Sequence, residues 1–425
     1  MAEKREKYEN PISVTTQFRF CGNPLRADMY RNCSFQCNYC FAKAHISHYD
    51  EEKGLKEIEG YGYVQKADIN RVKKYFERAF ESDEETKDIV VELLRHRTPI
   101  HVGGMSDPFQ PLEFREHLTY QLIQLSNKYK VPITFSTKQH ELPPEYWEIL
   151  NPELQAFQIS LIGYDADWIK KYEPNVGTPD QRIAFMEELK LRGFWVAMRV
   201  QPLIDLEQAE KVMLAVQDTV DYIIIEHLKV PMNSPSQIEL FNVSKKSPDW
   251  YTTGSSRFFE KRPWIKENDI KYLQSKVTHC KIGVGDNDFH HLSQSRCCCG
   301  IDTFGGAWDT YLKYNLTYFV TDPNPDVTHE ELEKTWMPKC SVKESFLSKG
   351  QFREIDLLKD YVDMYCVNNQ KYLRMKSKLE QYYANYLMKS ENARKFEKNA
   401  TQRDQLNLFD FTEEEPLDEE EYIDE

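Results

Sequence analysis

Three cysteines stand close together near the amino terminus, in the stretch 33-CSFQCNYCFAK-43. Cys33, Cys37 and Cys40 have the spacing C-x3-C-x2-C, and a tyrosine precedes the last of them. A closed structural zinc site needs four ligands, and two disulfides need four thiols. A group of three therefore indicates a metal group with one open position, or a zinc site that takes two of these cysteines and further ligands elsewhere, with the third thiol buried.

A cubane [4Fe–4S] cluster suits three thiolates. Each thiolate holds one iron, so the fourth iron stays open to another ligand. An open position is what separates catalytic from structural metal sites. S-Adenosylmethionine can chelate such an iron through its amino and carboxylate groups. An electron from the reduced cluster then breaks a C–S bond and yields a 5′-deoxyadenosyl radical.

The composition indicates a folded protein without a membrane span. The chain has 425 residues, 40% of them hydrophobic and 13% aromatic, which suffices for one large barrel or for two to three average domains. No stretch approaches roughly 18 consecutive apolar residues, and MAEKREKYENPISVTT at the start has no secretory-type apolar run. We therefore expect a cytoplasmic protein, in which ten cysteines favour metal binding or catalysis over disulfides.

Strand-like and helix-like segments alternate along the chain. Short apolar runs bounded by turn residues are typical of buried parallel strands, and apolar residues three to four apart are typical of helices. We expect strands at 24–32, 98–105, 131–138, 156–164, 194–204, 221–230 and 278–286. We expect helices at 67–80, 113–130, 180–194, 205–218 and 267–277. Repeated βα units predict an α/β fold, either a partial or full TIM-like barrel or a doubly wound sheet.

This pattern divides the chain into four parts. We expect an N-terminal extension over 1–24, the barrel over 25–300, a helical region over 301–400 and a disordered acidic tail over 401–425. Ligands of such folds collect at the carboxyl ends of the strands. Ten polar residues fall there: Cys33, Ser106, Asp107, Ser136, Lys138, Ser160, Arg199, Gln201, Glu226 and His227.

The cysteine spacing after a first strand, with an aromatic residue before the third cysteine, resembles the radical S-adenosylmethionine superfamily. The resemblance covers roughly residues 20–300. It implies a [4Fe–4S] cluster on Cys33, Cys37 and Cys40, S-adenosyl-L-methionine as the cosubstrate, and an external electron donor such as flavodoxin or ferredoxin. Motif by motif, it implies the following cofactor-binding residues: Tyr39, Gly103, Gly104, Ser106, Asp107, Ser136, Lys138, Ser160 and Arg199.

The resemblance also implies how these residues act. Tyr39 would face the adenine, and the Gly-Gly segment would receive the methionine amino group. The usual glutamate of that segment is missing, so Ser106 or Asp107 would take its role. The side chains at the ends of the third and fourth strands would contact the ribose and the carboxylate.

The stretches 103-GGMSDPFQPLE-113 and 135-FSTK-138 are similar to the branch of the superfamily that contains spore photoproduct lyase and DNA repair photolyase-like relatives. Spore photoproduct lyase returns a hydrogen atom through a cysteine and a tyrosine. The matching places hold Gly104 and Phe41, which cannot donate one. We therefore expect the same scaffold with a different reaction.

A second cysteine group follows at 280 and in 295-SRCCCGID-302. Cys298 and Cys299 are the candidates for a replacement hydrogen donor. A second Fe–S cluster would draw on Cys280, Cys297, Cys298, Cys299 and Cys340, although three adjacent cysteines cannot all face one cluster from an extended backbone. The alternative is a set of buried, inert thiols.

Two features near the carboxyl end point to DNA. The stretch 405-QLNLF-409 resembles the pentapeptide that binds the bacterial sliding clamp, in which Gln405 would fix the register and Leu406, Leu408 and Phe409 would fill an apolar groove. The alternative is a helix end that docks back onto the domain. The net charge of −14 includes ten carboxylates within 410–425, whereas 371–400 carries eight Lys and Arg against three Glu, interleaved with aromatic residues. Such a stretch suits nucleic acid, or is a solvated helix face.

The sequence therefore predicts a radical enzyme that acts on DNA, by repair or modification, and is recruited to the sliding clamp. A second hypothesis is a radical enzyme for a peptide, a transfer RNA or a small metabolite, possibly with an auxiliary cluster. A third is a binding module whose cluster is catalytically silent.

Overall fold

The computed structural model describes residues 7–308 except for 9–10, 15–22, 24, 43–55, 59–61, 87, 245–246, 248, 253–256, 287–288, 290–291, 296 and 306–307. Most of the predicted helical region, the acidic tail with its pentapeptide, and Cys340 lie outside the described residues. Among the described helices, none is long and apolar enough to cross a membrane.

An eight-stranded sheet forms the centre of the fold, in the order β15-β11-β10-β9-β8-β7-β3-β2. Its strands are β2 (Ile12–Val14), β3 (Leu25–Ala27), β7 (Ile100–Val102), β8 (Ile133–Thr137), β9 (Gln155–Ser160), β10 (Trp195–Leu203), β11 (Tyr222–His227) and β15 (Lys281–Val284). Neighbours from β3 to β15 pair in parallel, and only β2 runs antiparallel to β3 within this sheet. The α/β prediction is confirmed, and within the described ranges the sheet stays open between β2 and β15.

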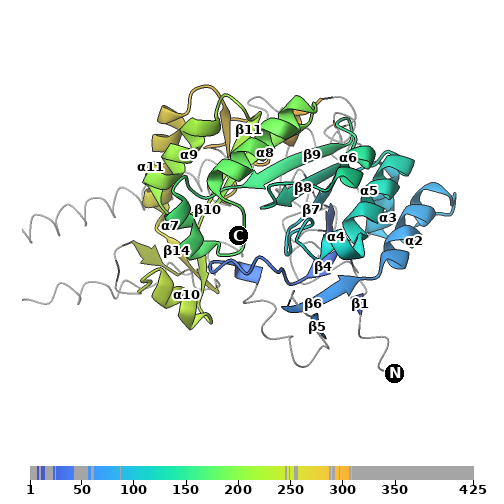
Figure 1. The fold of residues 1–425 in the computed structure, drawn as a ribbon, viewed down its shortest axis with the longest axis horizontal. Helices are drawn as coiled ribbons and strands as arrows, with labels where there is room; N and C mark the ends of the chain where they lie inside the picture. Colours follow the sequence, from blue (N-terminus) through green and yellow to red (C-terminus); the bar gives the residue numbers. More distant parts are fainter. Residues whose placement is uncertain are drawn as a thin grey trace, which may run out of the picture.

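Helices follow the strands around the outside of this sheet, from α2 at one end to α11 at the other (Figure 1). They are α2 (Ile69–Phe80), α3 (Ile89–Arg95), α4 (Glu113–Glu116), α5 (Leu118–Tyr129), α6 (Pro144–Ile149), α7 (Ala166–Tyr172), α8 (Pro179–Leu191), α9 (Leu206–Val216), α10 (Pro235–Leu240) and α11 (Pro263–Lys276). Side chains of Asp68, Asp165, Thr178 and Asp205 cap α2, α7, α8 and α9 by accepting backbone N–H bonds.

The helix predicted over 113–130 is in fact two helices. His117 stands between α4 and α5 with a left-handed φ of 54°. The fully buried Glu113 carboxylate accepts bonds from the N–H groups of Thr119 and Tyr120 at 3.0 and 2.8 Å, which lie in the first turn of α5. The carboxylate thus acts as the cap of a new helix, a contact that apolar spacing does not reveal.

Two smaller sheets flank the main one. One contains β1 (Lys7–Tyr8), β4 (Tyr30–Arg31), β5 (Lys56–Ile58) and β6 (Gly62–Ala67), and the other contains β12 (Lys229–Pro231), β13 (Trp250–Tyr251) and β14 (Phe258–Lys261). Strand β2, which joins the main sheet, comes from the segment predicted as an N-terminal extension. Most of these strands have only two or three residues, too few to give a period-2 pattern.

The two faces of the main sheet differ in chemistry. On β10, Val196, Met198 and Val200 are fully buried and belong to the large core that includes α8 and α9. Because strand side chains alternate between faces, Ala197 and Arg199 point to the other, concave face. Ala197 packs there with Tyr222 and Ile224 of β11 in a separate small cluster. The concave face becomes polar toward the carboxyl end of β10, where Arg199 and Gln201 lie.

A buried ion pair joins α7, α8 and β9. Glu173 ends α7, and its Oε2 lies 2.7 Å from the Arg182 guanidinium of α8, with both side chains fully buried. The same guanidinium donates to the carbonyl oxygen of Ser160 at the end of β9, at 2.8 Å. Burial alone would raise the pKa of Glu173. The charges of Arg182 and Lys138, and the hydrogen bonds that Tyr39 and Arg182 donate to the carboxylate, lower the pKa below its ordinary value.

The substitution Glu173→Gln should strongly destabilise the protein, because it leaves the Arg182 charge buried without a counter-ion. We expect the free energy of unfolding in urea to fall by about 3–5 kcal/mol at neutral pH. The matched control is Glu188→Gln on α8, whose carboxylate pairs with Arg192 at the surface; there we expect a loss of about 0–1 kcal/mol.

The ion pair of Glu173 and Arg182 also makes the stability of the fold depend on pH. A carboxyl whose pKa is lowered on folding stabilises the fold above its unfolded pKa, and this stabilisation disappears as the pH falls through the lower, folded value. Glu173→Gln should therefore flatten part of the acid limb of the stability curve. Equal losses in the Glu173→Gln and Glu188→Gln variants, with unchanged acid limbs, would contradict this role of Glu173.

Candidate functional site

The loop that carries the three cysteines begins at the end of β4, just beyond the first parallel strand, β3, as predicted. Its first turn is fixed by buried amides. Asn32 Oδ1 accepts from the N–H of Cys33 at 2.9 Å, and the fully buried Gln110 accepts from the N–H of Ser34 at 3.0 Å. Gln36 donates to the carbonyl of Cys33 at 2.6 Å. Asn32 and Gln36 adopt left-handed φ angles of 68° and 52°, a conformation that asparagine tolerates better than most residues.

The far end of the loop is fastened to two helices. Asn38 donates through its backbone to the carbonyl of Tyr172 at 2.8 Å, and through its side chain to that of Lys171 at 2.7 Å, both on α7. Gln237 of α10 donates to the carbonyl of Cys40 at 3.2 Å. The loop thus has a fixed path over elements that come more than 130 residues later in the chain.

Burial makes two of the three thiols hard to ionise. Burial, together with the nearby Asp107 and Cys40, raises the pKa of Cys33 to about 12. Burial also raises the pKa of Cys37, against the charge of Lys138, which lowers it. Ionising these thiols without a cation is therefore costly, whereas a bound metal group removes that cost, since a coordinating thiol loses its proton. The donor set fits an iron–sulfur cluster.

A mononuclear site is not formed in the described part of the chain. No three His, Cys, Asp or Glu side chains there are grouped closely enough to hold a single metal ion. The zinc alternative therefore has no ligand set among the described residues. Cysteines of a cubane bind separate irons, so they do not need to meet at one point.

The Gly-Gly segment follows β7 directly, as predicted. Gly103 has a φ of 105°, and a Cβ there would lie 2.2 Å from the carbonyl oxygen of Ser136, so only glycine fits. A Cβ on Gly104 would meet nothing closer than 3.8 Å, so there is free space beside this residue. Asp28, after β3, holds the segment by accepting from the N–H groups of Met105 and Ser106 at 2.9 and 3.3 Å.

Ser106 and Asp107 tie strand ends together. Ser106 Oγ donates to the carbonyl of Tyr30 at 2.7 Å. Asp107 accepts from Thr137 Oγ1 at 2.7 Å and from the N–H of Lys138 at 2.6 Å, at the end of β8. Both side chains are buried. The structure gives them positioning roles between β4, β7 and β8, and their contact with the methionine amino group stays a prediction.

Three predicted site residues meet around Glu173, which the sequence did not single out. Tyr39, before the last cysteine, donates its hydroxyl to the Glu173 carboxylate. The Lys138 ammonium lies 3.5 Å from the same carboxylate and 5.5 Å from the centre of the Tyr39 ring. Ser160 is joined to this group through its carbonyl oxygen, which accepts a bond from Arg182, the partner of Glu173. Glu173 follows an ordinary helical segment, 166-ADWIKKY-172, and no local pattern distinguishes it.

A polar row crosses the concave face from β7 to β11. Arg199 donates to Ser136 Oγ at 2.5 Å and to Gln158 Oε1 at 2.7 Å, and His101 Nε2 lies 2.7 Å from the same hydroxyl. Burial, with the charges of Arg199 and Arg26, lowers the pKa of His101, so its imidazole is neutral at pH 7.

The row continues toward β11. Arg199 also binds Gln201, which in turn donates to Glu226. The sequence analysis found Ser136, Arg199, Gln201 and Glu226. His101 and Gln158 were not predicted, although a polar residue within an otherwise apolar strand could have identified both.

The second cysteine group does not assemble a metal site within the described residues. Cys297, Cys298 and Cys299 lie in a turn, closed by a bond from the N–H of Gly300 to the carbonyl of Cys297 at 3.0 Å. The backbone of the three cysteines is therefore not extended. Cys280 instead donates weakly to the carbonyl of Val220, at 3.6 Å. A second cluster on these cysteines has no support in this part of the chain.

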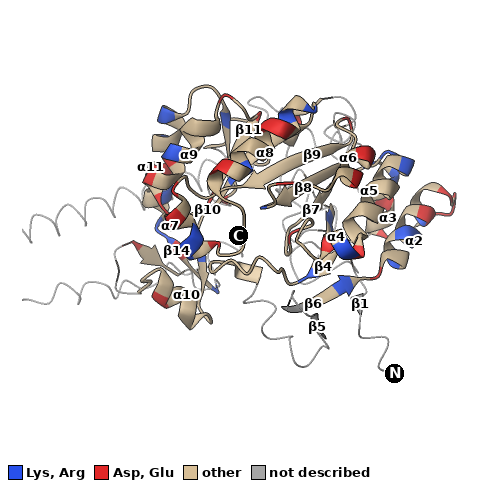
Figure 2. Cartoon of the chain, in the orientation of Figure 1, with Lys and Arg blue, Asp and Glu red and all other residues tan. Residues whose placement is uncertain are grey.

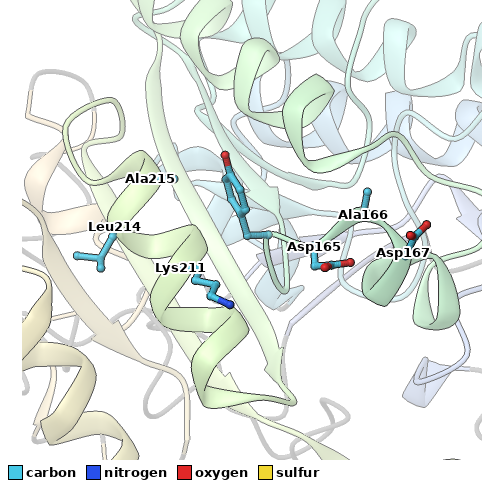
Figure 3. Close-up of a pocket in the computed structure, with 7 residues that line it drawn as sticks. Asp165, Ala166, Asp167, Lys211, Leu214 and Ala215 are labelled. Carbon is cyan, nitrogen blue, oxygen red and sulfur yellow. The ribbon is translucent and has the colours of Figure 1, made fainter.

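A separate hollow of roughly 900 Å³ lies on the outer surface between α7 and α9 (Figure 3). Its lining residues are Tyr164, Asp165, Ala166, Asp167, Lys211, Leu214 and Ala215. Asp165 caps α7, and Lys211 pairs with Glu207 at 2.6 Å. None of the predicted site residues lines it, so the hollow is distinct from the candidate site.

Comparisons with known proteins give similar folds. No family model and no curated protein matches the sequence. Among solved structures, the chain is similar to a spore photoproduct lyase variant with bound AdoMet and dinucleoside spore photoproduct, at 12% identity over 63% of this chain and 79% of that one, with a TM-score of 0.44.

It is also similar to SuiB from Streptococcus suis bound to the precursor peptide SuiA (13% identity, 84% of this chain, 67% of that chain, TM-score 0.40). A third is TsrM from Kitasatospora setae, a radical S-adenosylmethionine methyltransferase with tryptophan and a SAM analogue bound (8% identity, 69% of this chain, 60% of that chain, TM-score 0.42). Similarity at this level carries no argument about the substrate, so the function proposed next depends on the chain's own residues.

Proposed function

We propose that this protein is a radical S-adenosylmethionine enzyme. The observation that carries the proposal is a loop with three thiols at the carboxyl end of the first parallel strand, fixed by hydrogen bonds from Gln110, α7 and α10. When bound there, a [4Fe–4S] cluster with an open iron, reduced by a donor such as flavodoxin or ferredoxin, supplies the one-electron cleavage of S-adenosyl-L-methionine to a 5′-deoxyadenosyl radical.

The residues around the loop have separate tasks in this proposal. Cys33, Cys37 and Cys40 hold the cluster. Lys138 brings a positive charge near Cys37 that favours the thiolate, and Glu173 limits that charge by pairing with it. The free space beside Gly104 leaves room for the amino acid end of the cosubstrate without a side chain in the way.

The polar row on the concave face is the proposed substrate wall. It begins at the strand ends that also border the cysteine loop, where Arg199 donates to Ser136. The charges of Arg26 and Arg199 lower the pKa of the neutral His101; the Asp28 carboxylate lies near Arg26, and the Glu226 carboxylate ends the row. Guanidinium groups in a hydrogen-bonding wall suit a substrate that carries phosphates or carboxylates.

For the substrate, we propose DNA, by repair or modification, with recruitment to the bacterial sliding clamp. The guanidinium groups of the concave wall, the basic aromatic stretch 371–400 and the pentapeptide 405–409 support this assignment. The outer helices offer no comparable surface in the view of Figure 2, where positive and negative residues are interspersed. The alternative is a radical enzyme that acts on a peptide, a transfer RNA or a small metabolite, possibly with an auxiliary cluster.

Anaerobic reconstitution of variants that each lack one cysteine tests the enzyme class. We expect about four irons per chain in the unaltered protein, because one cubane contains four. Cys33→Ala, Cys37→Ala and Cys40→Ala should each lose most of the iron and form no 5′-deoxyadenosine from S-adenosylmethionine under dithionite, as measured by chromatography. Cys280→Ala, which removes a buried thiol outside the loop, is the control and should retain both. Zinc in place of iron, or product formation by all the loop variants, would overturn the proposal.

The clamp interaction is tested on the tail of the full-length chain. We expect Leu408→Ala with Phe409→Ala to weaken binding to the isolated sliding clamp at least about tenfold in surface plasmon resonance, because the two side chains fill the apolar groove. Leu417→Ala with Ile423→Ala, apolar residues of the same acidic tail, should bind as the unaltered chain does. Unchanged binding in the first pair would remove the clamp from the proposal. Deoxyadenosine formation should be equal in all three proteins.

A further inference from the structure

A turn of three adjacent cysteines lies against the concave face of the sheet. Residues 297–300 form a β-turn, closed between Cys297 and Gly300. Two glycines allow its close approach to β11 and β15. A Cβ on Gly283 would lie 2.1 Å from the carbonyl oxygen of Cys298, and a Cβ on Gly300 would lie 2.7 Å from the Tyr222 ring. The turn is therefore fitted to this surface and has little room to move away from its place on the sheet.

The three thiols of the turn lie within hydrogen-bonding reach of one another, and one pair meets across the turn. Cys297 Sγ lies 3.1 Å from Cys299 Sγ. Two thiolates on one zinc ion are held about 3.8 Å apart by Zn–S bonds of about 2.3 Å in a tetrahedron, and cysteines on separate irons of a cluster lie further apart still. Residues two apart in a turn fall within the Cα separation of about 4.4–6.8 Å that a disulfide spans. The contact thus favours S–S bond formation over metal ligation.

The pair also lies beside the polar row. Cys299 packs against the cluster of Ala197, Tyr222 and Ile224 on the concave face. Cys298 and Cys299 are close enough to Arg199 to influence the pKa of its guanidinium, which in turn holds Ser136 and Gln158. A change in these sulfur atoms therefore occurs in the wall of the concave face and next to its central charge.

We propose that Cys297 and Cys299 are a redox-active dithiol that closes reversibly to an intramolecular disulfide beside Arg199. This goes beyond the proposed function and does not depend on it. The oxidant is a small disulfide. One thiolate attacks it to give a mixed disulfide, and the second thiolate displaces the remaining reagent sulfur. One S–S bond forms and one breaks, and the two protons leave with the two thiols released from the reagent.

Closure changes the concave face without moving the sheet. It replaces two S–H groups by one S–S bond and removes hydrogen-bond donors from the neighbourhood of Arg199. The hydrogen bond with Cys298 and burial raise the pKa of Cys297 to about 12, so the thiols are protonated at neutral pH and exchange is slow rather than continuous. We therefore expect a pair that stays reduced in a reducing compartment and closes under sustained oxidation.

Peptide mass spectrometry on the full-length chain tests this. The protein is purified without oxygen, treated with oxidised glutathione, quenched in acid, unfolded and labelled with N-ethylmaleimide. The tryptic peptide 297–313 holds all three cysteines of the turn, and 277–281 holds Cys280 as an internal control. We expect the first peptide to take one label and to be about 2 Da lighter for the missing hydrogens, while Cys280 is fully labelled.

Three variants separate the pair from its neighbour. Cys298→Ser should still close, giving an unlabelled peptide about 2 Da lighter, whereas Cys297→Ser and Cys299→Ser should take two labels with no mass loss. Three labels on the unaltered peptide, or loss of closure in Cys298→Ser, would overturn the proposal. Loss of iron from reconstituted Cys297→Ser and Cys299→Ser, compared with Cys298→Ser, would instead assign these thiols to a metal. Thermal unfolding of each variant checks that the fold is intact.

Discussion

The buried carboxylate of Glu173 is the interaction on which the candidate site depends. It binds Arg182, which holds the end of β9, and it accepts the hydroxyl of Tyr39, which belongs to the cysteine loop. Lys138, at the end of β8, completes the group. One charge therefore connects the loop, two strand ends and two helices. Because a buried carboxylate is tolerated only with such partners, these residues fix one another's positions, and the three thiols are placed by packing that occurs far from them in the sequence.

The same logic explains the arrangement of the strand ends. Parallel strands bring their carboxyl ends to one edge, but the edge becomes a site only when the loops there are held in place. Asp28 and Asp107 do this by accepting backbone N–H groups from the neighbouring strand end, and the left-handed Gly103 permits the close contact with Ser136. The concave face then presents His101, Ser136 and Arg199 as one hydrogen-bonded row. The proposed radical reaction would need a preorganised surface of this kind, since the substrate must be held within reach of the reactive group.

The sequence predicted those parts of the structure that depend on local patterns. Apolar runs located β7, β8, β9, β10, β11 and β15, and the cysteine spacing located the loop at the first βα junction. Contacts between distant segments were not predictable, such as Gln110 with Ser34 and Glu173 with Tyr39. The short-range contact of Glu113 with the N–H groups that begin α5 was not predictable either, because apolar spacing carries no signal of it. A buried polar residue looks like an exposed one in a single sequence. The turn at Cys297 was missed because its shape depends on glycines packed against Tyr222, one of them on another strand.

The central claim is that a cluster on Cys33, Cys37 and Cys40 keeps one iron open to S-adenosylmethionine. Electron paramagnetic resonance of the reconstituted, dithionite-reduced protein tests this directly, with spectra recorded before and after addition of the cosubstrate. Direct coordination at an open iron predicts an axial or rhombic cubane signal whose g-values shift on addition, and a shift that the Cys37→Ala variant lacks. An identical spectrum with and without S-adenosylmethionine, from a cluster present at full occupancy, would show that the fourth iron is already capped and would contradict the account.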